Sequence, residues 1–255
     1  MTKAIFITAR TASKRLPRKA VVDICGRPAI EYLIDRAKKS RLSDQIILTT
    51  TDRPEDRILV EIAKNNSINY FAGDELDKLA RWQEAAAKYA VDFFVTADGD
   101  DLFCEPELMD LAFEQYMSSN CDFIEEKPGA NVPVGAFTYG IKTETLDKIC
   151  EIKGTSDTEM MSIYFTETPT VKVESLDNIP EIYKRPNIRM TLDYPEDLDF
   201  FRSIVSKLLS NGHEVSLRNA LSLIAANPHL VKINEFRNKD YLRNQKKRTN
   251  YIIKK

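Results

Sequence analysis

The sequence is poor in several residue types whose abundance would point to a particular class of protein. Of its 255 residues only eight are glycine, two are histidine and one is tryptophan. The four cysteines are scattered without C-x-x-C spacing, at Cys25, Cys104, Cys121 and Cys150. This scatter argues against a disulfide framework or a zinc site and is typical of reduced thiols in a cytoplasm. Both histidines lie late and outside every motif, so a histidine general base is not expected.

Long apolar runs and an excess of charge of one sign are also missing. No run approaches the roughly 18 apolar residues of a membrane helix, and no signal peptide precedes the first expected strand. The net charge is only −2 although 30% of the residues are charged, so general affinity for nucleic acid or membrane is not expected. The hydrophobic content of 43% is enough for the core of one large α/β domain. These features predict a cytoplasmic protein.

Two glycine-rich phosphate-binding motifs are absent, the P-loop G-x-x-x-x-G-K-[ST] and the dinucleotide motif G-x-G-x-x-G. Instead, an apolar strand expected at residues 4–8 leads into a loop with five cations: Arg10, Lys14, Arg15, Arg18 and Lys19. A strand, a loop and a helix in this order are typical of a phosphate site at the carboxyl end of a parallel strand. Without glycine, side chains must neutralise the phosphate, which suits a free nucleoside triphosphate. The alternative is a solvated surface loop, although Ser13 and Pro17 shape it as well.

Apolar segments alternate with amphipathic segments along the first half of the chain. Strands are expected at 45–49, 68–71 and 92–96. Between them, Pro54 opens a helix whose buried face would hold Ile58, Leu59, Ile62 and Ala63, and an Ala-rich helix runs to Ala90. This alternation predicts parallel βαβ units with right-handed crossovers.

The alternation ends after Phe123. The segment 127–175 is interpreted as an excursion with a loop at 127–135, a strand at 136–141, helices at 143–152 and from about 157, and a strand at 170–173. Residues 189–192 are expected to return to the sheet. The main domain would then be 1–210. A helical extension, 211–255, follows with a helix capped by Ser216 and a basic tail, 237–255, that is either solvated or a docking segment.

Acidic residues follow two of the expected strands. Asp98, Asp100 and Asp101 come after 92–96, and Asp193 comes directly after 189–192. The carboxyl ends of parallel strands form the ligand crevice of an open α/β sheet. Acids gathered there repel one another unless a cation or a turn offsets the repulsion. A cation site and an Asp-Gly turn with helix-capping acids both remain open, and the turn is favoured more for Asp98 and Asp101 than for Asp100.

The cationic loop resembles a known family signature. Ala9-Arg10-x-x-Ser13-x-Arg15-Leu16-Pro17-x-Lys19 is similar to the N-terminal motif of the CMP-sugar-acid synthetases, which include the 3-deoxy-manno-octulosonate and acylneuraminate cytidylyltransferases. Asp77-x-Leu79-Ala80-Arg81-Trp82 resembles a motif of the branch named spore coat polysaccharide biosynthesis protein F. The resemblance covers residues 4 to about 205. It implies a Rossmann-like, mostly parallel twisted sheet with helices on both faces.

The resemblance also implies an activity. The family transfers CMP from CTP to the anomeric hydroxyl of a 2-keto-3-deoxy sugar acid with Mg²⁺, releasing pyrophosphate for surface polysaccharide biosynthesis. It forms homodimers through the excursion. Alternatives are a nucleotidyltransferase acting on a phosphorylated sugar or alcohol, although the G-x-G-x-R loop of such enzymes is absent, a non-catalytic nucleotide-binding subunit of a polysaccharide pathway, and a glycosyltransferase using an activated sugar.

Residue roles follow from the same resemblance. The expected nucleotide-binding residues are Ala9, Arg10, Ser13, Arg15, Lys19, Asp77 and Asp98. The expected catalytic residues are Arg10, Arg15, Lys19 and Asp100. Asp100 and Asp193, the latter in a D-x-P-E-D-L signature, are expected to hold magnesium in its usual oxygen-rich arrangement. Where the octulosonate enzymes carry glutamine, glutamate and proline, this chain has Asp98, Asp101 and Leu102.

The acceptor carboxylate needs cations, and Lys184, Arg185 and Arg189 are the candidates, with ordinary surface charge as the alternative. Asp77 also suits a helix N-terminus. Glu196 and Asp197 fit the first turn of a helix beside Pro195.

Overall fold

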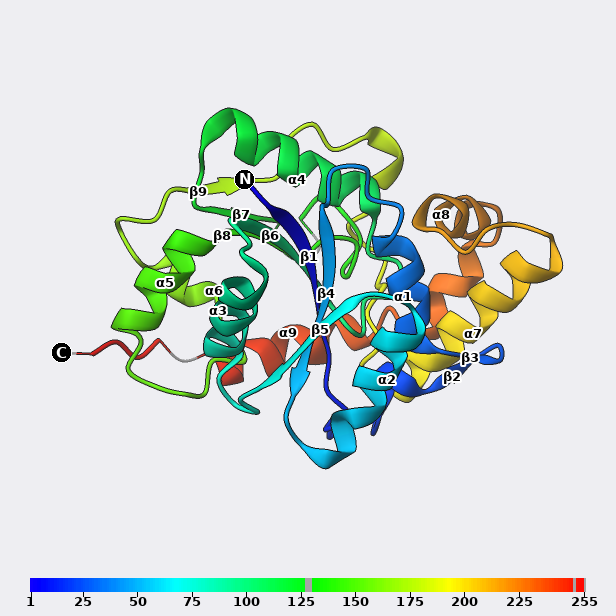
Figure 1. Cartoon of the computed structure of the whole chain (residues 1–255). Coiled ribbons are helices and arrows are strands. Elements are labelled where there is room, and N and C mark those ends of the chain that lie inside the picture. The colour runs from blue at the N-terminus through cyan, green and yellow to red at the C-terminus, as the bar shows by residue number, and fades with distance from the viewer. Residues whose placement is uncertain (127–129, 250, 255) are drawn as a thin grey trace.

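The computed structural model describes residues 1–126, 130–249 and 251–254 (Figure 1). Part of the expected loop, 127–129, and residues 250 and 255 of the basic tail lie outside the described residues. The described strands of the central sheet are β1 (Lys3–Thr8), β4 (Gln45–Thr51), β5 (Asn69–Gly73), β6 (Phe93–Asp98), β7 (Phe123–Glu125), β8 (Tyr139–Lys142) and β9 (Val173–Ser175). A small hairpin pairs β2 (Asp23–Ile24) with β3 (Arg27–Pro28).

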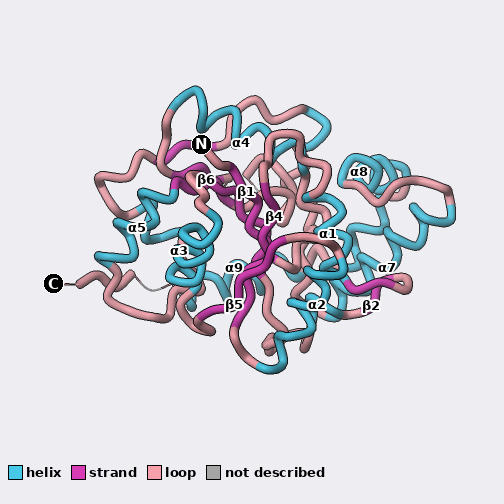
Figure 2. The backbone as a smooth tube through the Cα atoms, viewed as in Figure 1, coloured by secondary structure: helices cyan, strands magenta, loops and turns pink. Residues whose placement is uncertain are grey.

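The central sheet is mostly parallel and twisted, as the sequence predicts. Its strand order is β5-β4-β1-β6-β8-β7-β9, and Figure 2 shows these strands crossing the middle of the molecule. The pairs β5–β4, β4–β1, β1–β6 and β7–β9 are parallel, whereas β8 runs antiparallel to both β6 and β7. The excursion therefore contributes β8 and β9 directly to the sheet.

Helices cover both faces of this sheet. They are α1 (Ala29–Ala37), α2 (Arg57–Asn65), α3 (Lys78–Tyr89), α4 (Pro106–Ser119), α5 (Thr143–Ile152), α6 (Ser162–Thr166), α7 (Pro195–Ser210), α8 (Leu217–Ala226) and α9 (Arg237–Arg248). Successive residues of β1 point to opposite faces. Ile5 and Ile7 join the core under α1, α2, α4, α7 and α8, and Ala4 and Phe6 join the core under α3, α5 and α6.

The return of 189–192 to the central sheet is a prediction that is wrong. Arg189 forms only an isolated parallel bridge with Val134, and the Leu192 amide donates to the carbonyl of Asp100 at 2.9 Å. The segment looks like a strand in sequence because Met190 and Leu192 are fully buried. Burial produces the apolar pattern here without a strand ladder.

Three smaller predictions also differ from the structure. The second helix of the excursion begins at Ser162 instead of about 157. The strand expected at 170–173 lies later in the chain, as β9 at Val173–Ser175. The hydroxyl of Thr158 explains the late start, because it donates to Asp77 at 3.0 Å and accepts from the amide of Leu79 at 3.0 Å. These contacts hold the preceding residues in an irregular path. Ile58 lies 39% exposed, at the edge of the face that buries the rest of its set.

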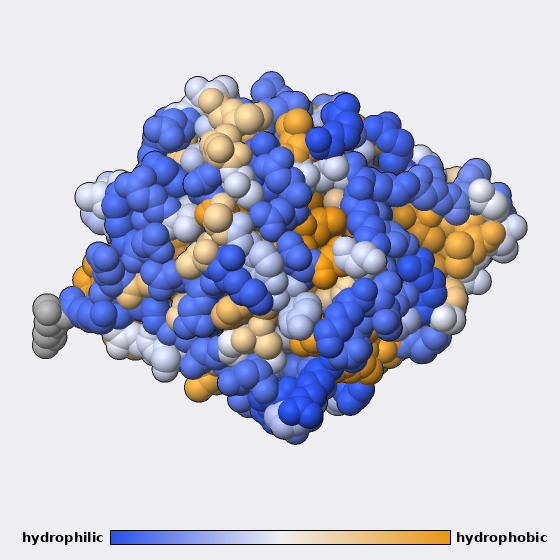
Figure 3. Space-filling model, viewed as in Figure 1, coloured by the Kyte–Doolittle hydropathy of each residue, from blue (hydrophilic) through white to orange (hydrophobic). Residues whose placement is uncertain are grey.

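The C-terminal extension is helical. Ser216 caps α8 as predicted, accepting a hydrogen bond from the amide of Asn219 at 3.2 Å. Residues 237–248 form α9 instead of a solvated tail. No helix in the described part of the chain has the length and apolar character to cross a membrane, and the face seen in Figure 3 is mostly hydrophilic.

Candidate active site

The cationic loop begins where β1 and β6 end side by side. The amide of Gly99 donates to the Thr8 carbonyl at 2.8 Å and so joins the two strand ends. A Cβ atom at Gly99 would lie only 2.6 Å from the Cβ of Ala9, so a larger residue does not fit. This contact brings the loop after β1 against the aspartates that follow β6.

Lys19 lies at the centre of the site. It begins a short 3₁₀ helix (Lys19–Val21), after Arg18 in the left-handed region with φ 57°. Its ammonium group donates to Asp193 Oδ1 at 2.7 Å and also to Asp100. Arg15 donates to the same oxygen of Asp193. We call Arg15, Lys19, Asp100 and Asp193 the Lys19 cluster, which joins the loop to two acids distant in sequence.

The charges of the cluster shift one another's pKa values. Burial alone would lower the pKa of Lys19, but the negative charges of Asp100 and Asp193 outweigh it and raise that pKa. Burial would raise the pKa of Asp193, but Lys19 and Arg15 hold it well below its ordinary value. Asp100 behaves differently. Burial, Asp193 and Asp98 together raise its pKa despite the contact with Lys19. At Asp100, burial and the two neighbouring carboxylates therefore outweigh the charge of Lys19.

A layer of buried charges orients Asp193 from behind. Arg189 is fully buried and donates to Asp193 Oδ2 at 3.3 Å and to the two oxygens of Asp197 at 2.8 and 3.0 Å. Asp197 also accepts from the amides of Asp193 and Tyr194, at 2.9 and 3.0 Å, in the first turn of α7. Asn234 donates to Asp197 at 3.0 Å. Sequence analysis missed this support, although the i, i+4, i+8 spacing of Arg189, Asp193 and Asp197 was visible.

Three aspartates gather beside Lys19. One carboxylate oxygen from each of Asp98, Asp100 and Asp101 lies within 4.8 Å of the others. Asp98 pairs with Lys78 at 2.9 Å, a contact that sequence analysis missed. Asp101 is buried, and burial together with the charges of Asp100 and Asp98 raises its pKa well above the ordinary value. An oxygen-rich, over-charged group of this kind matches the donor set that magnesium prefers.

The remaining nucleotide-binding candidates lie in different surroundings. Arg10 pairs with Glu159 of the excursion at 2.7 Å and donates to the carbonyl of Glu75 at 3.3 Å. Ala9 is buried, and Ser13 is half-buried on the loop. Asp77 caps α3 by accepting from the amide of Ala80 at 3.1 Å, and it pairs with Lys153. Its contacts are those of a structural residue.

The three acceptor-binding candidates are not brought together. Lys184 is exposed and pairs with Glu181 at 3.0 Å. Arg185 is exposed and donates to nearby carbonyl groups. Arg189 is buried beneath Asp193 with its charge already paired. Its geometry is that of a positioning residue, because it lies behind the cluster.

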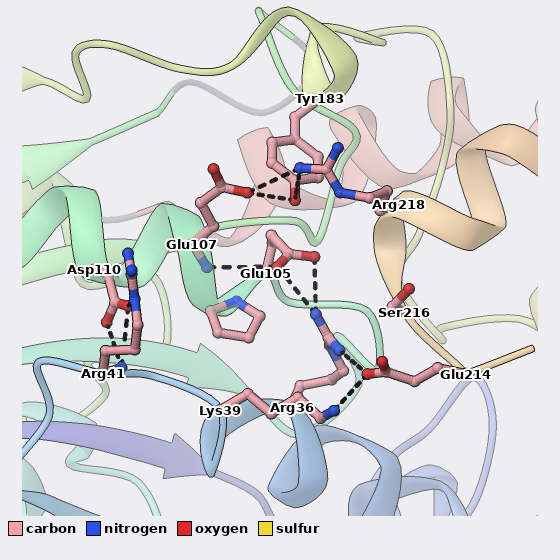
Figure 4. A pocket seen from close by; sticks show the side chains of 11 residues that line it. Arg36, Lys39, Arg41, Glu105, Glu107, Asp110, Tyr183, Glu214, Ser216 and Arg218 are labelled. Carbon is pink, nitrogen blue, oxygen red and sulfur yellow. Dashed lines mark hydrogen bonds and ion pairs between the residues drawn. The ribbon is translucent and has the colours of Figure 1, made fainter.

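A second group of charges lines a cavity of about 400 Å³ (Figure 4). Arg36 of α1 contacts both oxygens of Glu105 at 3.0 Å and pairs with Glu214 at 2.8 Å. We call these three residues the Arg36 cluster. Tyr183 and Arg218 also contact Glu107 across this cavity, at 2.7 and 3.2 Å. None of the predicted site residues lines it.

Comparison with known proteins identifies the family. The sequence model of a family described as cytidylyltransferase matches residues 4–207. The chain belongs to the cytidylyltransferase family. A solved structure of a cytidylyltransferase from Leptospira borgpetersenii has the same fold, with a TM-score of 0.80 and 24% identity, over 91% of this chain and 97% of that one.

Three relatives are similar to the chain over most of its length. An uncharacterized protein of Methanocaldococcus jannaschii is 32% identical over 92% of this chain and 96% of its own length. The spore coat polysaccharide biosynthesis protein SpsF of Bacillus subtilis is 24% identical over 88% and 94%. The 3-deoxy-manno-octulosonate cytidylyltransferase of Geobacter sulfurreducens is 25% identical over 66% and 63%. The resemblance of the cationic loop to this family is thereby confirmed.

Proposed function

We propose that this cytidylyltransferase transfers CMP from CTP to the anomeric hydroxyl of a 2-keto sugar acid. The observation that carries the proposal is the Lys19 ammonium group held between Asp100 and Asp193, with Arg15 beside it. A metal-bound triphosphate needs cations for its phosphates and carboxylates for its metal, and this edge of the sheet has both kinds of group. The acceptor oxygen would bond to the α-phosphorus as the α,β-phosphoanhydride bond breaks, and pyrophosphate would leave with the electron pair.

The two cations of the loop have a direct task in this reaction. Arg15 and Lys19 would exchange aspartate oxygens for the β- and γ-phosphate oxygens when CTP binds. They would then stabilise the charge that grows on pyrophosphate as it departs, which is where preorganised charges act most strongly. Arg189 and Asp197 would keep Asp193 in place during this exchange, because their contacts lie on its opposite side.

The aspartates fit a magnesium ion. Asp100 and Asp193 would hold it, with Asp98 and Asp101 close to Asp100. A bound magnesium supplies neutralisation of the α-phosphate and a lower pKa for the attacking hydroxyl. Burial raises the pKa values of Asp100 and Asp101, and repulsion from neighbouring carboxylates adds to the shift, so a cation at this point would stabilise both charged forms.

Similarity to a 3-deoxy-manno-octulosonate cytidylyltransferase supports a sugar acid as acceptor. Lys184 and Arg185 stay the proposed partners of its carboxylate, because they are exposed and close in sequence to the Arg189–Asp193 segment. The test is a screen of CTP against 3-deoxy-manno-octulosonate, N-acetylneuraminate and phosphorylated sugars, with released pyrophosphate as the readout. We expect release only with CTP, magnesium and a 2-keto sugar acid. Release with a phosphorylated sugar, or CTP binding without any release, would contradict the proposal.

We also propose that two copies associate through the excursion, 127–175, as the family resemblance implies. β8 and β9 of this segment belong to the central sheet, so pairing here would join the two sheets closely. Light scattering at micromolar concentration should give twice the mass of one chain. A monomeric mass would contradict the dimer and leave the proposed reaction untouched.

A further inference from the structure

Helix α9 connects two distant parts of the molecule across the candidate active site. At its start, Arg237 contacts both oxygens of Glu196 at 3.0 and 2.8 Å, in the first turn of α7. Beyond its end, the amide of Gly154 donates to the carbonyl of Ile252 at 2.7 Å, next to α5. Figure 1 shows α9, in red, passing beside the lower ends of the central strands. The helix thus runs from α7 to the excursion.

The polarity of α9 is inverted. A helix packed on a domain normally turns its aliphatic side chains inward and its charged side chains outward. Leu242 is the single aliphatic residue of α9, yet it is 54% exposed. Where burial is described, the partly buried positions instead carry an ion pair, three amides and a phenol: Arg237, Asp240, Asn238, Asn244, Gln245 and Tyr241. A polar inner face is unfavourable as simple packing, but it suits contact with a polar ligand.

Tyr241 links this inner face to the Lys19 cluster through Arg189. The Tyr241 ring lies 4.9 Å from the guanidinium of Arg189, which itself contacts Asp193. Burial raises the pKa of Tyr241 well above its ordinary value, and the charges of Asp101, Asp193 and Asp100 add to the shift. The contact with Arg189 places the phenol one residue away from Asp193.

One group on this face is unsatisfied. The side-chain oxygen of Asn238 is buried and has no hydrogen-bond partner among the described residues. Its neighbours differ, because Asn244 donates to the Tyr194 hydroxyl at 2.9 Å and Gln245 donates to Tyr241. Buried polar atoms in folded proteins nearly always have a partner, so this acceptor is available to a donor from a bound molecule. Sugar hydroxyl groups are donors of the required kind.

We propose that the inner face of α9 binds the acceptor, with Asn238 and Tyr241 hydrogen-bonding the hydroxyl groups of a polyhydroxylated sugar acid. This inference rests on the proposed function, which supplies the acceptor and its attack on CTP. The triphosphate has its own partners in the loop after β1, on residues that the family match covers, whereas α9 lies beyond that match. Residues 237–245 are then an acceptor-selecting wall added to a shared nucleotide site.

Two variants test the wall, Tyr241→Phe, which removes one hydroxyl, and Asn238→Ala. The matched controls are Leu242→Ala and Arg243→Ala, on the exposed side of the same helix. The acceptor is whichever of 3-deoxy-manno-octulosonate and N-acetylneuraminate the unaltered protein uses. We expect each test variant to raise the acceptor KM about three- to tenfold, the effect of one neutral hydrogen bond. The KM for CTP, the affinity for CTP in calorimetry and both controls should stay within about twofold.

The outcomes separate this inference from the proposed function. Turnover by the unaltered protein with unchanged acceptor KM in both test variants would overturn the role of α9 alone. An equal rise in the KM for CTP would also overturn it, because α9 would then support the nucleotide site. Absence of turnover by the unaltered protein with either sugar acid would overturn the proposed function and this inference together. Thermal unfolding of each variant shows whether a lost contact has merely loosened the fold, and Asn238→Ala decides if Tyr241→Phe is unstable.

Discussion

The Lys19 cluster and the Arg36 cluster contain the same kinds of side chain and differ in the charges that surround them. Arg36 and Glu105 are both buried and face each other through two hydrogen bonds. In the Lys19 cluster one ammonium group is shared by Asp100 and Asp193, and two further aspartates lie beside it. Arg36 links α1 to the start of α4. Lys19 contacts the two acids that are proposed to hold magnesium.

The comparison shows that charge and burial alone do not identify an active site. The Arg36 cluster lines a cavity of about 400 Å³, yet its carboxylates are paired, because Arg36 contacts both and Lys39 also pairs with Glu214 at 2.7 Å. The Lys19 cluster has two cations and two acids, but Asp98 and Asp101 lie beside it at the carboxyl ends of parallel strands, where α/β sheets bind ligands. Asp98 pairs with Lys78, whereas Asp101 has no ion pair among the described residues. Carboxylates without a full set of cation partners, at the carboxyl ends of the strands, therefore indicate an active site better than charge and burial alone. The following predictions test this difference.

The largest effect is expected from the acids of the Lys19 cluster. Asp100→Asn and Asp193→Asn should each lower kcat by about 10²–10³, because each removes an electrostatic element of the transition state. Folding should be retained, as judged by circular dichroism. Glu107→Gln, at the cavity of the Arg36 cluster, is the control and should change kcat less than about twofold. Near-normal turnover in a folded Asp100 or Asp193 variant would remove that residue from the mechanism.

The cations of the same cluster should have the next largest effect. Arg15→Ala and Lys19→Ala each remove a charge-assisted contact worth about 1.5–3 kcal/mol. This corresponds to about tenfold to several hundredfold in kcat/KM. Calorimetry should show weaker CTP binding but nearly unchanged CMP binding, because CMP lacks the β- and γ-phosphates. Lys38→Ala, an exposed residue after α1, should be silent. Equal weakening of both nucleotides would show that the loop does not hold the leaving group.

The Arg36 cluster should respond in stability instead of turnover. Arg36→Met leaves Glu105 buried without its partner, which typically costs about 3–5 kcal/mol of the free energy of unfolding. Urea denaturation would measure this loss, and kcat/KM should stay within about threefold. The double variant Arg36→Met, Glu105→Gln should recover part of the stability, because no unpaired buried charge remains. A loss of turnover comparable to that of Lys19→Ala would show that the cavity belongs to the active site.

The smallest effect concerns pH. Burial raises the pKa of Glu105 despite Arg36, so its ionised form becomes a cost as pH rises above about 4. The unfolding midpoint of Glu105→Gln should therefore shift upward relative to the unaltered protein between pH 4 and 7.

The pKa of Asp193 is lowered, so its stabilisation is complete above about pH 4 and is lost only on further acidification. The deficit of Asp193→Asn should stay constant from pH 5 to 7. A downward shift of the midpoint for Glu105→Gln, or a deficit of Asp193→Asn that changes between pH 5 and 7, would contradict the assigned directions.

Much of the fold was predictable, because local signals and tertiary structure agree there. β1, β4 and β6 each contain a continuous apolar run, at 4–7, 46–48 and 93–95, as buried parallel strands require. The segment 189–192 has the same apolar signal without a ladder, since burial between loops and burial in a sheet select the same residues. The late start of α6 depends on the contact of Thr158 with Asp77, which no local pattern encodes.

The site was predictable where one motif carries several functional residues. The loop from Ala9 to Lys19 and the acids after β6 meet as expected, and Lys19 contacts both predicted metal ligands. Lys78, Asn234 and Tyr241 reach the site from elements whose placement depends on the whole fold. Their side chains have no distinctive spacing in the sequence. The partnership of Arg189 with Asp197 was hidden for another reason, since Asp197 has an adequate explanation at the first turn of α7.

The tight contact between Ala9 and Gly99 makes the two positions mutually dependent in mutation. A methyl group added at Gly99 collides with the methyl group already present at Ala9. Gly99→Ala should therefore be damaging by itself and partly tolerated when Ala9 becomes glycine, whereas Ala9→Gly costs little by itself. An evolutionary path through this pair is one-way, because the glycine at position 9 has to come first. The space between two strand ends thus sets the order in which this site can change its sequence.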